Sequence, residues 1–137
     1  MPCITPRQRG FTLVEVLTTC TLLALLAAFS WPSLKERELQ IGRIDAVQAL
    51  TRVQQAQEQF RSAHGLYAAD LSALAGTAPR SPQGRYAIHL ALDGPEGYRV
   101  SALAQGTQAA DATCATLTLQ VRQGFAQTGP DARCWLR

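Results

Sequence analysis

An apolar run near the amino terminus constrains this chain more than any other feature. Residues 11–31 read FTLVEVLTTCTLLALLAAFSW, and Glu15 is the only charged residue among them. As a helix rising 1.5 Å per residue, the run would be about 30 Å long, the thickness of the hydrocarbon core of a bilayer. Arg7 and Arg9 precede it, and basic flanks favour the cytoplasmic side. The run therefore predicts one membrane-spanning helix over 11–31 with a cytoplasmic amino terminus.

A cleaved secretory signal peptide is the main alternative for a basic start followed by an apolar run. The apolar part of such peptides is usually about 7–15 residues long and ends at small residues. This run is longer, and it ends in Trp31 followed by Pro32. Ala27 and Ala28 keep the alternative open, but the length favours an uncleaved anchor.

Composition limits the remaining possibilities. The chain has 137 residues, enough for one domain, and 17% of them are charged, against roughly 25% in an average soluble domain. The formal net charge is +3, too mild for a histone-like protein. After residue 63, six arginines face five acidic residues, a weak basis for binding several phosphates. Clustering of Arg122, Arg133 and Arg137 in the fold would strengthen that basis.

The sequence RGFTLVEVL, residues 9–17, resembles the amino-terminal signature of type IV pilins and related pseudopilins. The resemblance implies that residues 1–10 are a leader, that a prepilin peptidase cuts between Gly10 and Phe11, and that Phe11 is then N-methylated. It also implies that Glu15 pairs with the amine of Phe11 on a neighbouring subunit during assembly. An ion pair in an apolar bundle agrees with this role, because leaving either charge unpaired there is costly.

Residues 32–63 predict an amphipathic helix that continues into a globular region. Pro32 lacks a backbone N–H, so we expect a kink there. His64 and Gly65 end the pattern, and glycine suits the position after a helix. Apolar residues recur on one face with the helical period, which predicts packing against the following domain. This stripe comprises Leu39, Ala46, Ala49, Leu50, Val53, Ala56 and Phe60.

A second helix face carries Ile41, Ile44 and Val47, which we interpret as contacts between packed subunits. Gly42 is a weak point, costing up to about 1 kcal/mol relative to alanine in a helix.

Residues 64–137 predict a loop followed by a small antiparallel sheet. Residues 65–85 are rich in glycine, proline, serine and alanine, with one short helical turn expected at 70–74. Alternating apolar residues predict strands at 86–92, 98–104 and 116–122, with 93–97 as a turn. The inward positions would be Tyr86, Ile88, Leu90, Leu92, Leu117, Leu119 and Val121. The fold class is therefore α+β, a long helix packed on a small antiparallel sheet.

The four cysteines are expected to have different structural roles. Cys3 lies in the leader and Cys20 in the apolar run, where it would be a small packing residue. Cys114 and Cys134 would face an oxidising compartment, and a disulfide between them would close a loop worth roughly 3 kcal/mol. Two free thiols are the alternative, and the spacing excludes a CxxC redox or zinc motif. A carboxy-terminal cysteine pair is also a common pilin feature.

Catalytic motifs are absent from the sequence. His64 and His89 form no joint motif, no serine lies in a G-x-S-x-G context, and no glycine-rich loop follows a strand. We expect no enzyme activity, no cofactor and no metal.

The carboxy-terminal part extends the resemblance to pilins. Residues 111–119, with Cys134 and Trp135, resemble minor pilins of the PilE/ComP type, whereas residues 64–85 match only loosely. The resemblance implies a minor subunit of a type IV pilus that supports pilus biogenesis, twitching motility or adhesion. Its partners would be other pilin subunits, the prepilin peptidase/methylase and the inner-membrane assembly platform. It would reside in the bacterial inner membrane before assembly and in the extracellular pilus afterwards. A DNA-receptor pilin for natural transformation and a type II secretion pseudopilin are the alternatives.

Overall fold

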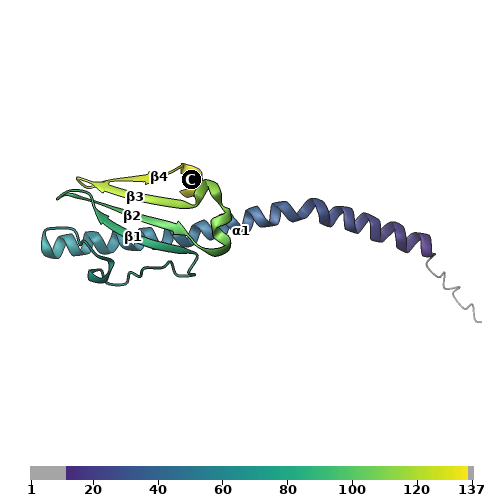
Figure 1. Cartoon of the computed structure of the whole chain (residues 1–137), viewed down its shortest axis with the longest axis horizontal. Helices are drawn as coiled ribbons and strands as arrows, with labels where there is room; N and C mark the ends of the chain where they lie inside the picture. Colours follow the sequence, from purple (N-terminus) through teal and green to yellow (C-terminus); the bar gives the residue numbers. More distant parts are fainter. Residues whose placement is uncertain (1–11, 136–137) are drawn as a thin grey trace, which may run out of the picture. The chain divides into compact units, whose positions relative to one another are not determined.

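The computed structural model describes residues 12–135, except for the side chains of residues 29–33. The chain divides into two compact units, Met1–Glu36 and Arg37–Arg137, and each is described here by itself. The single α-helix of the described chain, α1 (Leu13–His64), supplies residues to both units (Figure 1). It ends one residue beyond the predicted boundary.

In the first unit, side-chain hydroxyls satisfy backbone groups of an otherwise apolar helix. Thr12 precedes α1, and its Oγ1 accepts a hydrogen bond from the N–H of Glu15 at 3.3 Å, as a helix N-cap does. The hydroxyls of Thr18 and Thr19 both donate to the carbonyl of Glu15, at 3.0 Å. The large apolar side chains of this part of α1 are exposed: Leu13, Val14, Val16, Leu17, Leu22, Leu23, Leu25 and Leu26.

Two predictions concern this part of α1, a membrane-spanning stretch and a kink at Pro32. Within the described residues, no helical stretch combines the length and the apolar character required of a membrane span. The helix continues through Pro32, whose side chain lies outside the described atoms, so the kink stays a prediction.

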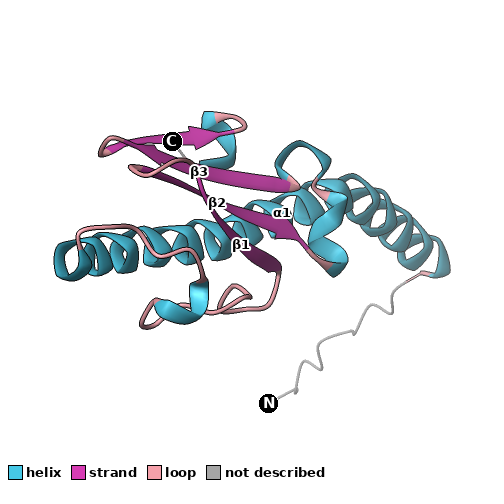
Figure 2. Cartoon of the chain, turned by 60° about the vertical axis from the view of Figure 1, so that its left-hand side comes forward, coloured by secondary structure: helices cyan, strands magenta, loops and turns pink. Residues whose placement is uncertain are grey.

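The second unit is the predicted α+β arrangement, with four antiparallel strands rather than three. The strands are β1 (Tyr86–Leu92), β2 (Gly97–Ala104), β3 (Thr116–Arg122) and β4 (Phe125–Gly129), and they lie side by side in the order of the sequence. Short 3-10 turns precede, connect or follow the strands: η1 (Leu71–Ala73) before β1, η2 (Gly106–Ala110) and η3 (Ala112–Cys114) between β2 and β3, and η4 (Ala132–Trp135) after β4. One face of the sheet packs on α1, as Figure 2 shows.

The core lies between α1 and this inner face of the sheet, where the predicted stripe packs. Five stripe residues are buried, whereas Leu39 and Phe60 are partly buried. Ile41 and Ile44 are exposed as expected, but Val47 packs at the edge of the core, because it follows Ala46 at the margin of the stripe. Leu92, expected inside, is about half exposed at the end of β1. The buried stripe residues are Ala46, Ala49, Leu50, Val53 and Ala56.

Gly42 permits a close approach between α1 and η2. A Cβ at this position would lie 1.9 Å from Oε1 of Gln108, a side chain that is itself buried. The amide of Gln108 donates to the carbonyl of Leu39 at 2.9 Å. The glycine predicted as a weak point of the helix is therefore required by packing.

Candidate nucleic-acid interface

The residues predicted at the amino terminus are only partly described. Gly10 and Phe11 lie outside the described residues. Glu15 is exposed in the first turn of α1, and no cation of residues 12–135 lies within ion-pair distance of its carboxylate.

The predicted disulfide is confirmed. Cys114 and Cys134 are bonded, with an S–S distance of 2.03 Å, and both are fully buried. The alternative of two free thiols is excluded for this pair. Cys20 is free and exposed.

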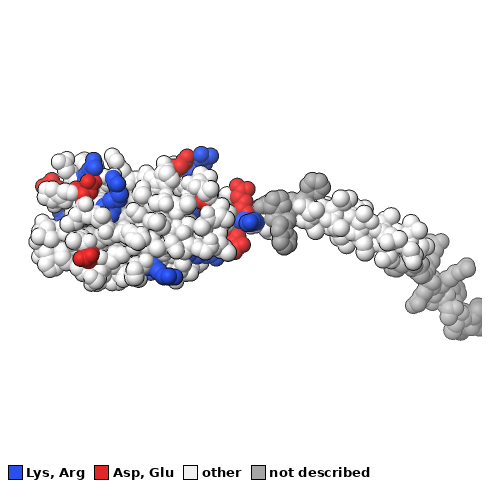
Figure 3. Space-filling model, in the orientation of Figure 1, with Lys and Arg blue, Asp and Glu red and all other residues white. Residues whose placement is uncertain are grey.

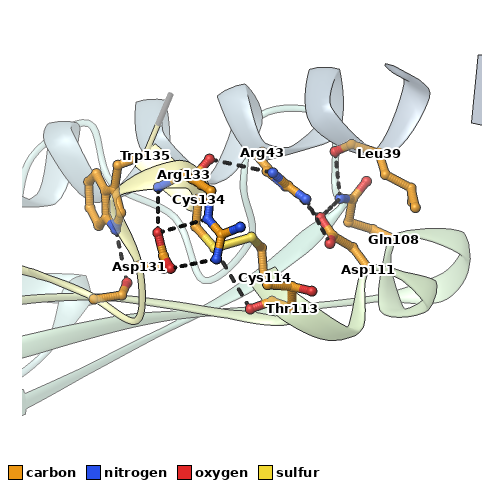
Figure 4. The surroundings of a disulfide bond; sticks show 11 residues. Leu39, Arg43, Gln108, Asp111, Thr113, Cys114, Asp131, Arg133, Cys134 and Trp135 are labelled. Atoms are coloured by element: carbon orange, nitrogen blue, oxygen red, sulfur yellow. Dashed lines mark hydrogen bonds and ion pairs between the residues drawn. A yellow bond between two sulfur atoms is a disulfide. The ribbon is translucent and has the colours of Figure 1, made fainter. Parts of the chain in front are cut away.

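A largely buried ion pair joins α1 to the chain just before the disulfide (Figure 4). Arg43 donates from Nε to Asp111 at 2.7 Å and from a second guanidinium nitrogen at 3.0 Å, so the contact is bidentate. Arg43 also donates to the carbonyl of Arg133 at 3.4 Å. One arginine of α1 thus contacts residues close to both cysteines: Asp111, three residues before Cys114, and Arg133, directly before Cys134.

The loop over residues 65–85 is anchored to α1 by a buried carboxylate. Asp45 is 1% exposed and accepts hydrogen bonds from the hydroxyl of Ser81 and from the N–H of Gln83, the latter at 2.9 Å. The N–H of Arg85 lies at 3.4 Å from the same carboxylate. Ser81 in turn accepts a hydrogen bond from the N–H of Tyr86 at 2.9 Å. Asp45 therefore fixes the loop between α1 and the start of β1.

This anchor places two arginines at the same hollow. Arg52, two turns after Asp45 on α1, and Arg80, next to Ser81, both line a hollow of about 80 Å³ together with Thr77. Both side chains are exposed, and neither makes an ion pair within residues 12–135. We call Arg52 and Arg80 the loop arginine pair. Because neither guanidinium group is paired with a carboxylate of residues 12–135, both are available to bind an anion such as a phosphate.

Two other exposed arginines of the globular unit, Arg122 and Arg133, are already paired with carboxylates. Arg122 donates to Asp93 at 2.7 Å, and this hydrogen bond, with a second from Gln120, lowers the pKa of Asp93. Arg133 donates to Asp131 at 3.0 Å and likewise lowers the pKa of that carboxyl group. Figure 3 accordingly shows blue atoms beside red atoms at several places on one face.

The structure therefore does not supply the cluster of Arg122, Arg133 and Arg137 that would have strengthened phosphate binding. Arg122 and Arg133 are each matched by a carboxylate close by, and Arg137 lies outside the described residues.

The loop arginine pair could not be predicted from a local pattern, because the two arginines lie 28 positions apart in the sequence. The sequence did carry a signal for Asp45, the anchor of the loop that holds Arg80. Asp45 lies directly before Ala46 and four residues before Ala49, so helical periodicity places it on the buried face rather than off the stripe. A carboxylate on a buried face needs hydrogen-bond donors, and in the structure the following loop supplies them.

Comparison with known proteins agrees with the fold. Residues 32–118 match a family described as "Type IV minor pilin ComP, DNA uptake sequence receptor". Residues 5–31 match the prokaryotic N-terminal methylation motif. No curated protein matches the chain. The family match covers the part of α1 from residue 32 onward, the loop arginine pair, β1, β2 and the first three residues of β3.

Proposed function

The chain belongs to the family of the type IV minor pilin ComP, and on this premise we propose that it is a pilus subunit that binds double-stranded DNA. The family match over residues 32–118 is the observation that carries the proposal. It favours the DNA-receptor alternative over a secretion pseudopilin. The loop arginine pair lies inside the matched range, which supports a role for it in that function.

Phosphate contact is the chemistry that suits the loop arginine pair. Arginine binds phosphate through parallel N–H donors, and each phosphate neutralised releases bound counterions. Arg52 comes from a helix and Arg80 from an anchored loop, so both guanidinium groups start from fixed backbone positions. A paired arginine such as Arg133 would first have to leave its carboxylate.

The test is the salt dependence of DNA binding by the full chain in detergent micelles. For Arg80→Gln we expect the slope of log Kd against log salt to fall by about one unit, because one phosphate contact is lost. Arg133→Gln is the matched control, since it removes the same charge from an exposed arginine that is already paired. Equal slopes in the two variants would assign the effect to net charge alone. Absence of binding by the unmodified chain would overturn the proposed function.

We also propose that the subunit enters the fibre through its amino-terminal helix. The leader of residues 1–10 would be removed after Gly10, and Phe11 would be methylated by the same peptidase. The N-terminal methylation motif over residues 5–31 and the exposed apolar side chains of α1 support this proposal. Partners would then be other pilins and the inner-membrane assembly platform, with the protein anchored in the inner membrane before assembly. Pilins are structural proteins, so we propose no catalytic role.

A further inference from the structure

The edge strand β1 is paired along only half of its outer side. β1 is the first strand of the sheet, and the loop over residues 65–85 pairs with its beginning (Figure 1). The N–H of Ile88 donates to the carbonyl of Pro79 at 2.9 Å, and the N–H of Ser81 donates to the carbonyl of Tyr86 at 2.9 Å. Within the described chain, no backbone hydrogen bond joins the loop to β1 beyond Ile88.

The second half of β1, residues 88–92, leaves its outer backbone groups without strand partners. Backbone groups point alternately to the two sides of a strand, so those of Leu90 point away from β2, as those of Ile88 do. On this side, the N–H and carbonyl of Leu90 have no backbone partner among residues 12–135. Lysine, proline or a bulge commonly protects an edge strand, but residues 88–92 read IHLAL and keep a regular register. We call residues 88–92 the open edge.

The apolar side chains of β1 lose their cover at the same place. Tyr86 and Ile88, beside the loop, are 0% and 3% exposed. Leu90 and Leu92 share their face of the strand, yet Leu90 is only partly buried and Leu92 is 48% exposed. A further strand beside the open edge would therefore cover two leucines and satisfy the free backbone groups together.

A groove of about 370 Å³ lies between β1 and the loop. This volume falls within the range of about 300–1,000 Å³ that is typical of ligand-binding pockets. Ile88 and Leu90 line the groove from β1, and Leu71 lines it from η1. Asp70 adds a carboxylate that is exposed and makes no ion pair within residues 12–135. The groove thus combines an open edge, apolar side chains and one negative charge.

We propose that the groove binds an extended peptide segment of another protein, which joins the sheet as an additional strand at the open edge. Main-chain hydrogen bonds supply affinity in this mode of recognition, and alternate side chains supply specificity. An apolar side chain of the peptide lies against Leu90, and a lysine or arginine faces Asp70. A second copy of this chain suits the groove less well, because its edge strands, YAIHLAL and FAQTG, contain neither lysine nor arginine. The inference goes beyond the proposed function, since it needs no DNA.

The experiment titrates a short labelled peptide, in which valine alternates with lysine and threonine, against the full chain in detergent micelles. Two further peptides are N-methylated at one or the other alternating set of amides. The set that faces β1 should lose about 10-fold in affinity, because its hydrogen bonds are removed, whereas the other set should keep its affinity. Asp70→Asn should weaken binding of the unmethylated peptide by about 2- to 5-fold. Glu38→Gln, at an exposed acid of α1 outside the groove, is the matched control and should not.

Amide hydrogen exchange locates the bound peptide. Exchange at residues 88–92 should slow in the complex, because the N–H of Leu90 gains an acceptor. Absence of peptide binding, equal affinity of the two methylated peptides, or unchanged exchange at residues 88–92 would each overturn the inference. Exchange that slows there as the concentration of the peptide-free chain rises would also overturn it, assigning the open edge to a second copy. Equal binding by Asp70→Asn and the unmodified chain would overturn the choice of a basic partner.

Discussion

At the scale of single residues, the buried hydroxyl group of Tyr98 stands without a partner among the described residues. Tyr98 is fully buried, its ring packs edge-on against Tyr67 at 4.8 Å, and its hydroxyl has no hydrogen-bond partner within residues 12–135. Burial raises the pKa of Tyr98, and the Glu58 carboxylate adds to the rise. By contrast, the hydroxyl of Tyr67 bonds to both Arg61 and Glu58.

We expect Tyr98→Phe to increase the free energy of unfolding at pH 7 by about 1 kcal/mol, because an unpaired buried hydroxyl is removed. The folded pKa of Tyr98 lies above the unfolded value near 10. Below about pH 10 the phenol is neutral in both the folded and the unfolded chain, so its ionisation does not affect stability. Above pH 10 the phenol ionises more readily in the unfolded chain, so the free energy of unfolding falls as the pH rises. The variant should lose less stability than the unmodified chain above pH 10.

Denaturant unfolding of the full chain at pH 7 and above pH 10 measures both effects. Tyr67→Phe is the control, and it should lower stability at pH 7, since its hydroxyl is hydrogen-bonded. A Tyr98→Phe variant that is less stable at pH 7 would mean that the hydroxyl has a partner after all.

At the scale of elements, the loop over residues 65–85 depends on one carboxylate. We expect Asp45→Ala to expose this loop, because the donors of Ser81 and Gln83 lose their acceptor. Hydrogen bonds to a charged group are worth about 1.5–3 kcal/mol, so amide exchange at Gln83 should accelerate roughly 10- to 100-fold. Hydrogen-exchange mass spectrometry of the full chain measures the rate.

Asp70→Ala is the matched control in the same loop. Asp70 precedes η1 but makes no capping hydrogen bond from its side chain, contrary to the capping role that its position suggests. Its removal should leave the exchange of Gln83 unchanged. Equal acceleration in both variants would show that the loop responds to lost charge and not to the anchor.

The elements also show what the sequence could predict. β1 and β3 were predicted at their exact bounds, because alternating apolar residues reveal a strand with one buried face. β4 was missed because FAQTG buries no side chain, so its pattern carries no such signal. The loop arginine pair and the bidentate contact of Arg43 with Asp111 join residues far apart in sequence, which no local pattern encodes. The disulfide was predictable because few cysteines remained to pair.

At the scale of the whole molecule, the proposed assembly role of Glu15 can be tested. We expect Glu15→Leu to be cleaved and retained in the membrane but poorly incorporated into fibres. The amine of Phe11 on a neighbouring subunit would be left buried and unpaired, a penalty of about 3–5 kcal/mol. Immunoblots of sheared and membrane fractions measure incorporation.

Glu38→Leu is the matched control, because Glu38 is also an exposed acid of α1 but lies outside the apolar run. It should enter fibres normally. Normal incorporation of Glu15→Leu would contradict the assembly role of this carboxylate.

The covalent bond between Cys114 and Cys134 also determines how the domain bears mechanical load. The hairpin turn between β3 and β4 lies near the middle of a closed segment with a sequence separation of 20 residues, so both of its arms return to one crosslink. If a tethered polymer pulls on the turn, each arm holds about ten residues, and the tip can travel only about 35 Å before the crosslink stops it. Arg43 contacts this segment close to the crosslink, so the tension would pass directly into α1. Within the segment, β4 would peel away first, because it adds no side chain to the core, whereas β3 is held by its buried residues.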